Sequence, residues 1–255
     1  MLDYDLEAAT YDQTRGGMER ARAAANAVLE LVPELVPGLV PERTAVLLDV
    51  ACGTGIVSEL LKAPGRTVIG VDASAGMLEV AKTRLELPVR GDATRLPIAS
   101  HSADAVTFMW LLHLVSPEVV AGAVREAARV LRPGGVMVTT VNKNSAQFST
   151  ESDAGALLRA AQRELAPPAT DDFERVNAVA AEAGLEYVGG SGYVGHNQGK
   201  SPRQWIRLVR EQFTWSHDAA PERIAELCRE LGALPGQDVR RPDPVYRVAG
   251  FRWQG

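Results

Sequence analysis

The stretch that decides the fold is Leu47-Leu48-Asp49-Val50-Ala51-Cys52-Gly53-Thr54-Gly55, an apolar run that ends in two closely spaced glycines. A continuous apolar run bounded by turn residues is typical of a parallel strand that is buried on both faces. Glycines after such a strand let the backbone turn tightly and approach a ligand closely. The stretch therefore predicts a strand, a ligand-binding turn and a following helix.

A second apolar run, Val68-Ile69-Gly70-Val71-Asp72, ends in an acid 23 positions after Asp49. An acid at the tip of the second strand of such a unit can accept hydrogen bonds from the hydroxyls of a ribose. Together the two runs predict a site for a cofactor that contains a nucleoside.

Length and charge restrict the class of protein. The 255 residues suffice for one α/β domain with insertions, and the net charge is −5. No block of Lys and Arg is present, so we expect no nucleic-acid partner. No apolar stretch reaches the roughly 18 residues of a membrane span, and the N-terminus lacks a signal-peptide core. We expect a cytoplasmic protein with no membrane partner, and its oligomeric state, monomer or dimer, stays open.

The first half of the chain alternates between strand and helix patterns. Strands are predicted at 44–51, 66–71, 89–92, 103–109 and 136–141, with helices at 55–63, 74–85 and 117–132. Ser74 and Ser116 are the predicted N-caps of the last two helices. Such alternation favours a parallel sheet that is covered on both faces.

The two ends of the chain follow other patterns. After Asn142, helices are predicted at 151–165, 173–183, 201–215 and 221–232, and strands at 186–194 and 245–253. This order indicates a closing antiparallel pair of strands with a helical cap, at about residues 197–240, inserted between them. Residues 1–43, with a helix at 18–32 and then Pro33, Pro37 and Pro41, are predicted to form an N-terminal helical arm or lid, and residues 44–255 the main domain.

The glycine pattern bears on the identity of the cofactor. A dinucleotide fingerprint has a third glycine, where this chain has Ser58, and the phosphate-binding loop of nucleotide triphosphatases is absent. An NAD-dependent reductase is therefore the weaker alternative.

Four motifs occur in order: LLDVACGTG (47–55), VIGVDAS (68–74), GDATRLPIASHSADAV (91–106) and LRPGGVMVTT (131–140). In these motifs the chain resembles class I S-adenosylmethionine-dependent methyltransferases of the small-molecule type 11 or UbiE-like kind, over about residues 44–142. The resemblance implies a Rossmann-like three-layer α/β sandwich, with a mostly parallel seven-stranded sheet, a terminal antiparallel strand and the helical cap insert. It also implies S-adenosyl-L-methionine as cofactor.

The resemblance assigns cofactor contacts to individual residues. Asp72 would bind the ribose and Asp92 the adenine amine, while an early Tyr and Arg, here Tyr11 and Arg15, would close over the cofactor. An Arg fork suits the carboxylate of the methionine part. The other implied contacts are Asp49, Ala51, Gly53, Gly55, Ala73, Met77, Ala93 and Met109. Plainer interpretations stay open: a turn or cap role for Asp49, helix packing for Met77, and a solvated arm around Tyr11.

The acceptor side offers one main candidate for proton transfer. His113 follows the fourth predicted strand and could accept a proton from a phenol, thiol or amine, although a packing or capping histidine is the alternative. Weaker candidates for substrate contact are Trp110, Tyr193, His196 and Trp205, the last of which could equally be core of the cap. Trp110, Asn142 and Asn144 occupy the places where related enzymes hold magnesium with carboxylates, so we expect no metal.

The predicted activity is methyl transfer to a small organic acceptor, such as a secondary metabolite. It proceeds by in-line displacement, for which the protein aligns the reactants and excludes water. O-methylation is the most generic outcome, and N-, C- and S-methylation stay open. A reductase, or a cofactor-binding module without transfer activity, are the alternatives.

Overall fold

The computed structural model describes residues 4–32, 44–149, 151–211 and 213–255. The chain breaks predicted at Pro33, Pro37 and Pro41, and the expected domain boundary after residue 43, lie outside these ranges. Within them, the N-terminal arm consists of α1 (Tyr4–Glu7), α2 (Tyr11–Thr14) and α3 (Gly17–Leu31).

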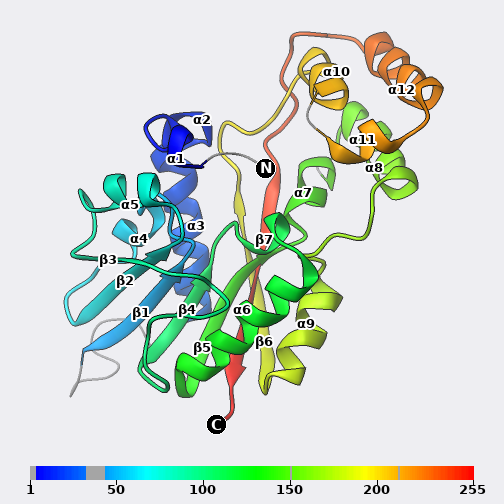
Figure 1. The fold of residues 1–255 in the computed structure, drawn as a ribbon. Helices are drawn as coiled ribbons and strands as arrows, with labels where there is room; N and C mark the ends of the chain where they lie inside the picture. Colours follow the sequence, from blue (N-terminus) through cyan, green and yellow to red (C-terminus); the bar gives the residue numbers. More distant parts are fainter. Residues whose placement is uncertain (1–3, 33–43, 150, 212) are drawn as a thin grey trace.

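A seven-stranded sheet forms the centre of the molecule, with the order β3-β2-β1-β4-β5-β7-β6 (Figure 1). Its strands are β1 (Ala45–Val50), β2 (Arg66–Asp72), β3 (Leu87–Arg90), β4 (Ala103–Phe108), β5 (Leu131–Val141), β6 (Leu185–Val194) and β7 (Val245–Trp253). The first five strands pair in parallel, and β7 pairs antiparallel with both β5 and β6. The predicted fold class, including the antiparallel strand at the end of the chain, is confirmed.

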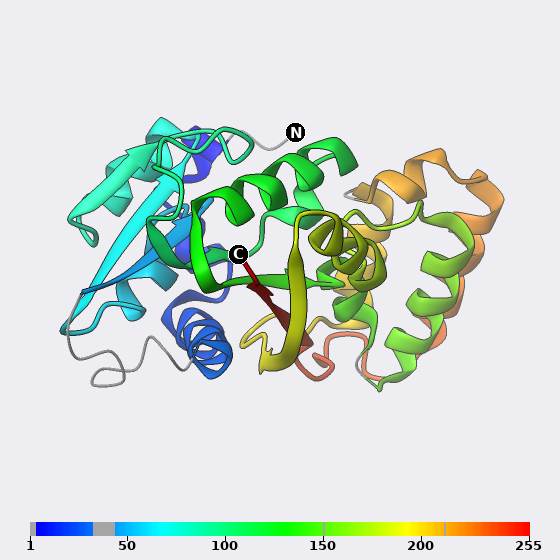
Figure 2. The ribbon, with the colours of Figure 1, turned by 90° about the horizontal axis from the view of Figure 1, so that it is seen from below.

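Helices cover both faces of this sheet (Figures 1 and 2). On one face lie α3, α4 (Ile56–Leu60) and α5 (Ala75–Ala81), and on the other α6 (Pro117–Val130) and α9 (Phe173–Glu182). Consecutive residues of a strand point to opposite faces, so Leu47 joins the first core cluster and Leu48 the second, both fully buried. This double burial explains why β1 is an uninterrupted apolar run.

The predicted caps of two helices are present. The Ser74 hydroxyl accepts a hydrogen bond from the Met77 backbone at the start of α5, and Ser116 does the same for Val119 at the start of α6. The structure thereby fixes where each helix begins relative to the strand before it.

A helical cap follows the ends of β5 and β6 (Figure 1). It contains α7 (Lys143–Ser149), α8 (Asp153–Leu165), α10 (Pro202–Glu211), α11 (Thr214–Asp218) and α12 (Pro221–Ala233). Their shared buried cluster is Phe148, Leu158, Trp205, Val209, Trp215, Leu227 and Leu231. The sequence placed the insert at about residues 197–240, and the cap core also takes in α8, which follows β5.

One helix prediction in the cap is wrong. The sequence predicted a single helix over 201–215, but α10 ends at Glu211 and α11 begins at Thr214. Phe213 has extended backbone and its ring packs against Trp205, Trp215 and Phe148. Tertiary packing of this ring therefore overrides the helical pattern of the sequence. Trp205 and Trp215 therefore do not lie on opposite sides of one helix.

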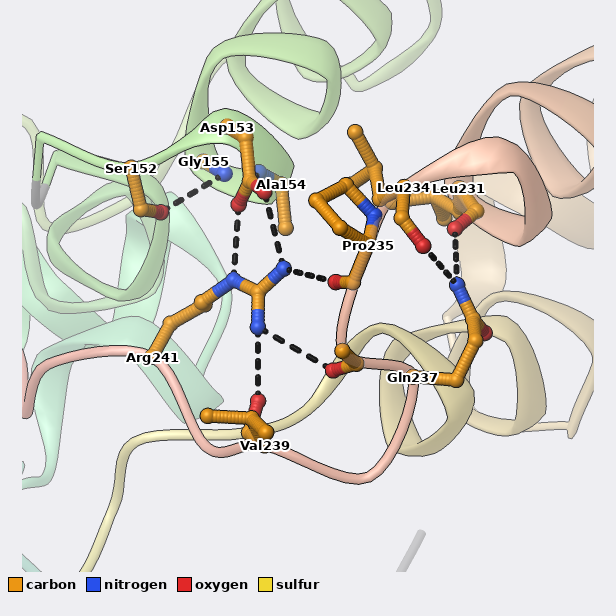
Figure 3. A network of polar contacts seen from close by, with 11 residues as sticks. Ser152, Asp153, Ala154, Gly155, Leu231, Leu234, Pro235, Gln237, Val239 and Arg241 are labelled. Atoms are coloured by element: carbon orange, nitrogen blue, oxygen red, sulfur yellow. Dashed lines mark hydrogen bonds and ion pairs between the residues drawn. The ribbon is translucent and has the colours of Figure 1, made fainter.

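Arg241 joins the two chain segments of the cap (Figure 3). Its guanidinium donates to both carboxylate oxygens of Asp153, at 2.7 and 2.8 Å, at the start of α8. It also donates to the carbonyls of Pro235, Gly236 and Val239, in the loop after α12. This bidentate geometry fixes α8 against the loop, so the cap packs as one unit.

In the described part of the chain, no helix is long and apolar enough to span a bilayer.

Candidate cofactor and acceptor site

Three strand ends carry residues in an unusual backbone conformation. Ala51, Trp110 and Asn142 follow β1, β4 and β5 and have φ values of 58°, 67° and 53°. Side chains other than glycine, and bulky ones above all, rarely adopt positive φ, and such positions cluster at functional sites. All three lie at the carboxyl edge of the parallel strands, where open α/β sheets bind their ligands.

The glycine turn and the acid at the tip of β2 are bonded directly to each other. Gly53 and Gly55 have φ values of 57° and 74°, which glycine adopts without strain. The backbone N–H of Gly53 donates to Asp72 at 2.8 Å, and that of Ser74 donates to the other oxygen at 2.8 Å. Burial raises the pKa of the Asp72 carboxyl. Because a carboxylate oxygen accepts more than one hydrogen bond, Asp72 keeps capacity for ribose hydroxyls.

Asp49 lies beneath this turn, with its side chain 2% exposed. Its two carboxylate oxygens accept hydrogen bonds from the hydroxyls of Ser58 and of Thr107, the latter at 2.7 Å. The carboxylate thus braces the turn from inside and joins α4 to β4. Ser58 stands where a dinucleotide site has its third glycine, and its partner Asp49 explains why a hydroxyl is useful there.

Asp49 makes stability depend on pH in a defined direction. Burial raises the pKa of this carboxyl to about 6, whereas an unfolded Asp titrates near ~3.9. The folded state therefore binds more protons, and the stability that Asp49 contributes is complete below about pH 4 and lost as pH rises through about 6. We expect denaturant unfolding from pH 4 to 7 to give a shallower pH dependence in Asp49→Asn than in the parent. Asp238→Asn, on the cap surface, is the matched control, and parallel curves for all three proteins would contradict the assignment.

The predicted adenine contacts lie along α5 and after β3. Met77 is buried against the glycine turn, and Ala73 is exposed at the end of β2. Asp92 is exposed, and its Oδ1 accepts from the backbone and hydroxyl of Thr94 at 2.7 and 2.8 Å, with Ala93 half-buried beside it. These bonds lower the pKa of Asp92 and use one oxygen, so its other oxygen can receive an exocyclic amine.

The N-terminal arm packs against the glycine turn and the start of α5. Asp12 accepts from the Thr54 hydroxyl at 2.6 Å and pairs with Arg84 at 2.7 Å, and Asp5 accepts from the Gly76 backbone at 2.8 Å. The Tyr11 ring consequently lies close enough for the Asp72 charge to contribute to its raised pKa. Sequence reasoning missed Asp12 and Asp5, because an acid in a short helix gives no sign of its distant partner.

Arg15, the predicted partner of the cofactor carboxylate, is held by the arm itself. Its guanidinium pairs with Glu7 at 3.3 Å and lies 5.7 Å from the Tyr11 ring centre. Both contacts are partly exposed, so the ion pair is weak and can exchange for a bound carboxylate.

Arg20 lies on the acceptor side, which is the side of the site with the predicted acceptor residues Trp110 and Tyr193. Sequence reasoning missed this arginine. This residue of α3 is 4% exposed, and its guanidinium lies 3.9 Å from the Trp110 ring centre and 5.4 Å from that of Tyr246. The Trp110 indole donates to the Tyr193 hydroxyl at 2.6 Å. The signal available in the sequence was an arginine at a position on the apolar face of an alanine-rich helix. Trp110 and Tyr193, predicted separately, are thus brought together, and Met109 is buried in the core cluster that they pack into.

His113 lies in the short 3-10 helix Leu112–Leu114, and its Nδ1 is buried without a hydrogen-bond partner in the described residues. Burial first, and then the charges of Lys143 and Arg20, hold the pKa of His113 well below its usual 6.5. The imidazole is therefore neutral at physiological pH, which is the form that a general base has before it reacts.

The two remaining predicted substrate residues belong to the cap side. The carbonyl of His196 lies against the arm, since a Cβ added to Gly16 would come within 2.8 Å of it. Trp205 is 4% exposed in the cap core, and the Lys200 ammonium lies 5.1 Å from its ring centre. Trp205 thus lies in the core of the cap, which is the alternative interpretation of this residue. Among the residues described here, no three His, Cys, Asp or Glu side chains gather as metal ligands.

Comparison with known proteins identifies the central part of the chain. Residues 48–139 match the family model described as "Methyltransferase domain". This part of the chain is similar to methyltransferase domains. It holds the glycine turn, Asp72, Asp92 and His113, whereas the arm and the helices of the cap lie outside it.

Two curated relatives extend the match. A demethylmenaquinone methyltransferase of Mycobacterium sp. (strain KMS) is 37% identical over 146 residues, which cover 54% of this chain and 63% of that protein. One from Beutenbergia cavernae is 47% identical over 106 residues, 41% of each chain. The chain therefore spans less than two thirds of the length of these relatives.

Solved structures agree with the fold. The [4+2]-cyclase SpnF gives a TM-score of 0.57 at 18% identity, over 98% of this chain and 93% of that one. A protein titled as a sarcosine dimethylglycine methyltransferase of Galdieria sulphuraria gives 0.54 at 18% identity, over 92% and 86%. At this identity the likeness shows the fold alone.

The cofactor that the methyltransferase domain implies is S-adenosylmethionine. The polar groups present suit its adenosyl part, because the carboxylates of Asp72 and Asp92 can accept hydrogen bonds from hydroxyls and an amine. Gly53 has no side chain, so a ligand can approach the backbone of the turn closely. The arm adds aromatic Tyr11 and cationic Arg15 from the other side. The residues present therefore fit the cofactor.

Proposed function

We propose that the protein transfers the methyl group of S-adenosylmethionine to a small organic acceptor. The observation that carries the proposal is the bond from Gly53 to Asp72, which joins the glycine turn to the acid at the tip of β2 inside the methyltransferase domain. That pairing suits a ribose at the carboxyl edge of the sheet, next to the buried side chains of the acceptor side.

Each part of the site has a task in this reaction. Asp72 would hold the ribose, Asp92 the adenine amine and Arg15 the carboxylate of the cofactor, which supplies an activated methyl group when bound. The arm and the cap would exclude water and align the acceptor, the main requirement for an in-line displacement. His113, neutral and buried, would take the proton of the acceptor nucleophile.

The acceptor class is supported by the aromatic rings on this side. Trp110, Tyr193 and Tyr246 surround Arg20 and suit a flat organic molecule. The curated relatives are named for demethylmenaquinone, which makes a quinone-type ring the second candidate for the acceptor. O-methylation stays the simplest outcome, and methylation of nitrogen, carbon or sulfur gives the competing products.

Two measurements test the proposal. Calorimetry with S-adenosylhomocysteine and with NADH separates a methyltransferase from a reductase, and we expect binding of the first alone. A panel of phenols, amines, thiols and hydroquinones with methyl-labelled S-adenosylmethionine then tests transfer. Labelled product supports the proposal, and binding without transfer to any member favours a cofactor-binding module. The assay is decisive because SpnF, with the same fold, is titled a cyclase.

A further inference from the structure

Cations from several elements gather on the acceptor side of the site. Arg20 comes from α3, Lys143 opens α7, and Lys200 precedes α10. Building on the proposed function, we propose that the acceptor is an organic acid, whose anionic oxygen binds between Arg20, Lys143 and Lys200.

Arg20 is a buried charge without an acidic partner among the described residues. Its Nη1 donates to the Arg15 carbonyl at 2.7 Å, and its Nε is buried with no partner in the same part of the chain. The faces of Trp110 and Tyr246 stabilise the cation, but neither ring neutralises it. An unpaired buried charge is costly, so a guanidinium in this position suits an anion.

Lys143 is the second cation. Its backbone N–H donates to Asp171 at 2.7 Å. Burial and the repulsion of Arg20 outweigh the attraction of Asp171 and lower the pKa of Lys143 to about 7. Asp171 is a poor counterion because burial raises its own pKa, and its Oδ1 lacks a partner within the described ranges.

Lys200 reaches the same region from the cap. Its ammonium donates to the Gln198 carbonyl at 3.0 Å, and its carbonyl accepts from the Arg241 backbone at 3.1 Å. Burial, Arg240 and Arg20 lower the pKa of Lys200 to about 8. Asp243 offsets this only in part, because its carboxylate already accepts from the backbones of Gly199 and Asn197.

These cations are more than the carboxylate of the cofactor needs. Arg15 pairs with Glu7 beside the Tyr11 ring, where it can serve the carboxylate of the cofactor, although its charge also acts on Lys143 and Lys200. Arg20 and Lys143 both act on His113, the proposed proton acceptor, which places them on the acceptor side. A neutral acceptor would leave these repelling cations unpaired, whereas an anion stabilises all of them.

Binding of an acid here has a signature that a neutral ligand lacks. The groups that face Lys143 are Arg15, Arg20, His113, Asp171 and Lys200. An anion among them favours the charged ammonium, so Lys143 takes up a proton when the acid binds near neutral pH. The uptake is measurable as a dependence of the calorimetric heat on the buffer.

The experiment uses the full chain saturated with S-adenosylhomocysteine, and a panel of aryl and alkyl carboxylates and phenols paired with their amides and methyl ethers. We expect acids to raise the melting temperature more than their neutral partners, and the best acid to bind at least tenfold tighter at pH 7.5 with proton uptake. Lys143→Met should abolish the preference and the uptake, while Lys143→Arg keeps the preference. Lys82→Met, an exposed lysine paired with Glu79, should leave both unchanged.

The outcomes separate the two proposals. If S-adenosylhomocysteine does not bind, the proposed function fails. If it binds but neutral members bind equally well, or no acid binds, only the acid-acceptor inference is overturned. A preference that survives in Lys143→Met also overturns the role of Lys143, and Lys143→Arg guards against a folding defect as the cause.

Discussion

Replacing Asp72 with alanine is expected to weaken binding of S-adenosylhomocysteine roughly 10- to 150-fold, the equivalent of about 1.5–3 kcal/mol for hydrogen bonds to a charged group. The side chain acts in two ways, because it also accepts from the Gly53 and Ser74 backbones. Its removal leaves the glycine turn without its anchor. Isothermal calorimetry at constant salt measures the loss directly.

Two variants separate the ribose contact from the anchoring of the turn. Asp72→Asn keeps one acceptor oxygen and should lose less affinity than Asp72→Ala, while Asp238→Ala, exposed on the cap, should lose none. Unfolding midpoints of all variants show whether the turn stays folded. Unchanged affinity in a folded Asp72→Ala protein would remove Asp72 from the cofactor site.

Much of the fold was predictable because the sheet obeys local rules. Strand β1 is apolar at consecutive positions such as Leu47 and Leu48, since both of its faces are buried. The serine caps at Ser74 and Ser116 and the glycine turn are equally local, so sequence alone locates the carboxyl edge. Asp72 and Trp110 could be predicted as site residues because they lie at that edge.

The rest depends on contacts between distant segments, which no local pattern encodes. Arg20 lies in α3 and Lys143 at the start of α7, and their charges act on each other only because the fold brings these two helices together. The break between α10 and α11 depends on Phe213 packing on Trp205. The role of Asp49 was equally unpredictable from nearby sequence, since its hydrogen-bond partner Thr107 is 58 positions away.

The second large effect is expected at His113. His113→Ala should lower kcat about 10²-fold with the acceptor found in the labelled panel, the usual contribution of a positioned general base. The affinity for S-adenosylhomocysteine should stay within about twofold, because a general base acts in the transition state. His113→Gln keeps a polar side chain of similar size but accepts no proton, so it should be as slow as His113→Ala.

The pH profile distinguishes a proton acceptor from a packing residue. An ordinary histidine with a pKa near ~6.5 would lose roughly three quarters of its neutral form at pH 6. Burial, Lys143 and Arg20 hold the pKa of His113 well below that value, so its neutral form persists and kcat at saturation should stay flat from pH 8 to 6. A fall in kcat over this range would contradict a neutral His113 as the base. Full activity in His113→Gln would assign the residue to packing, since shape without proton acceptance would then suffice.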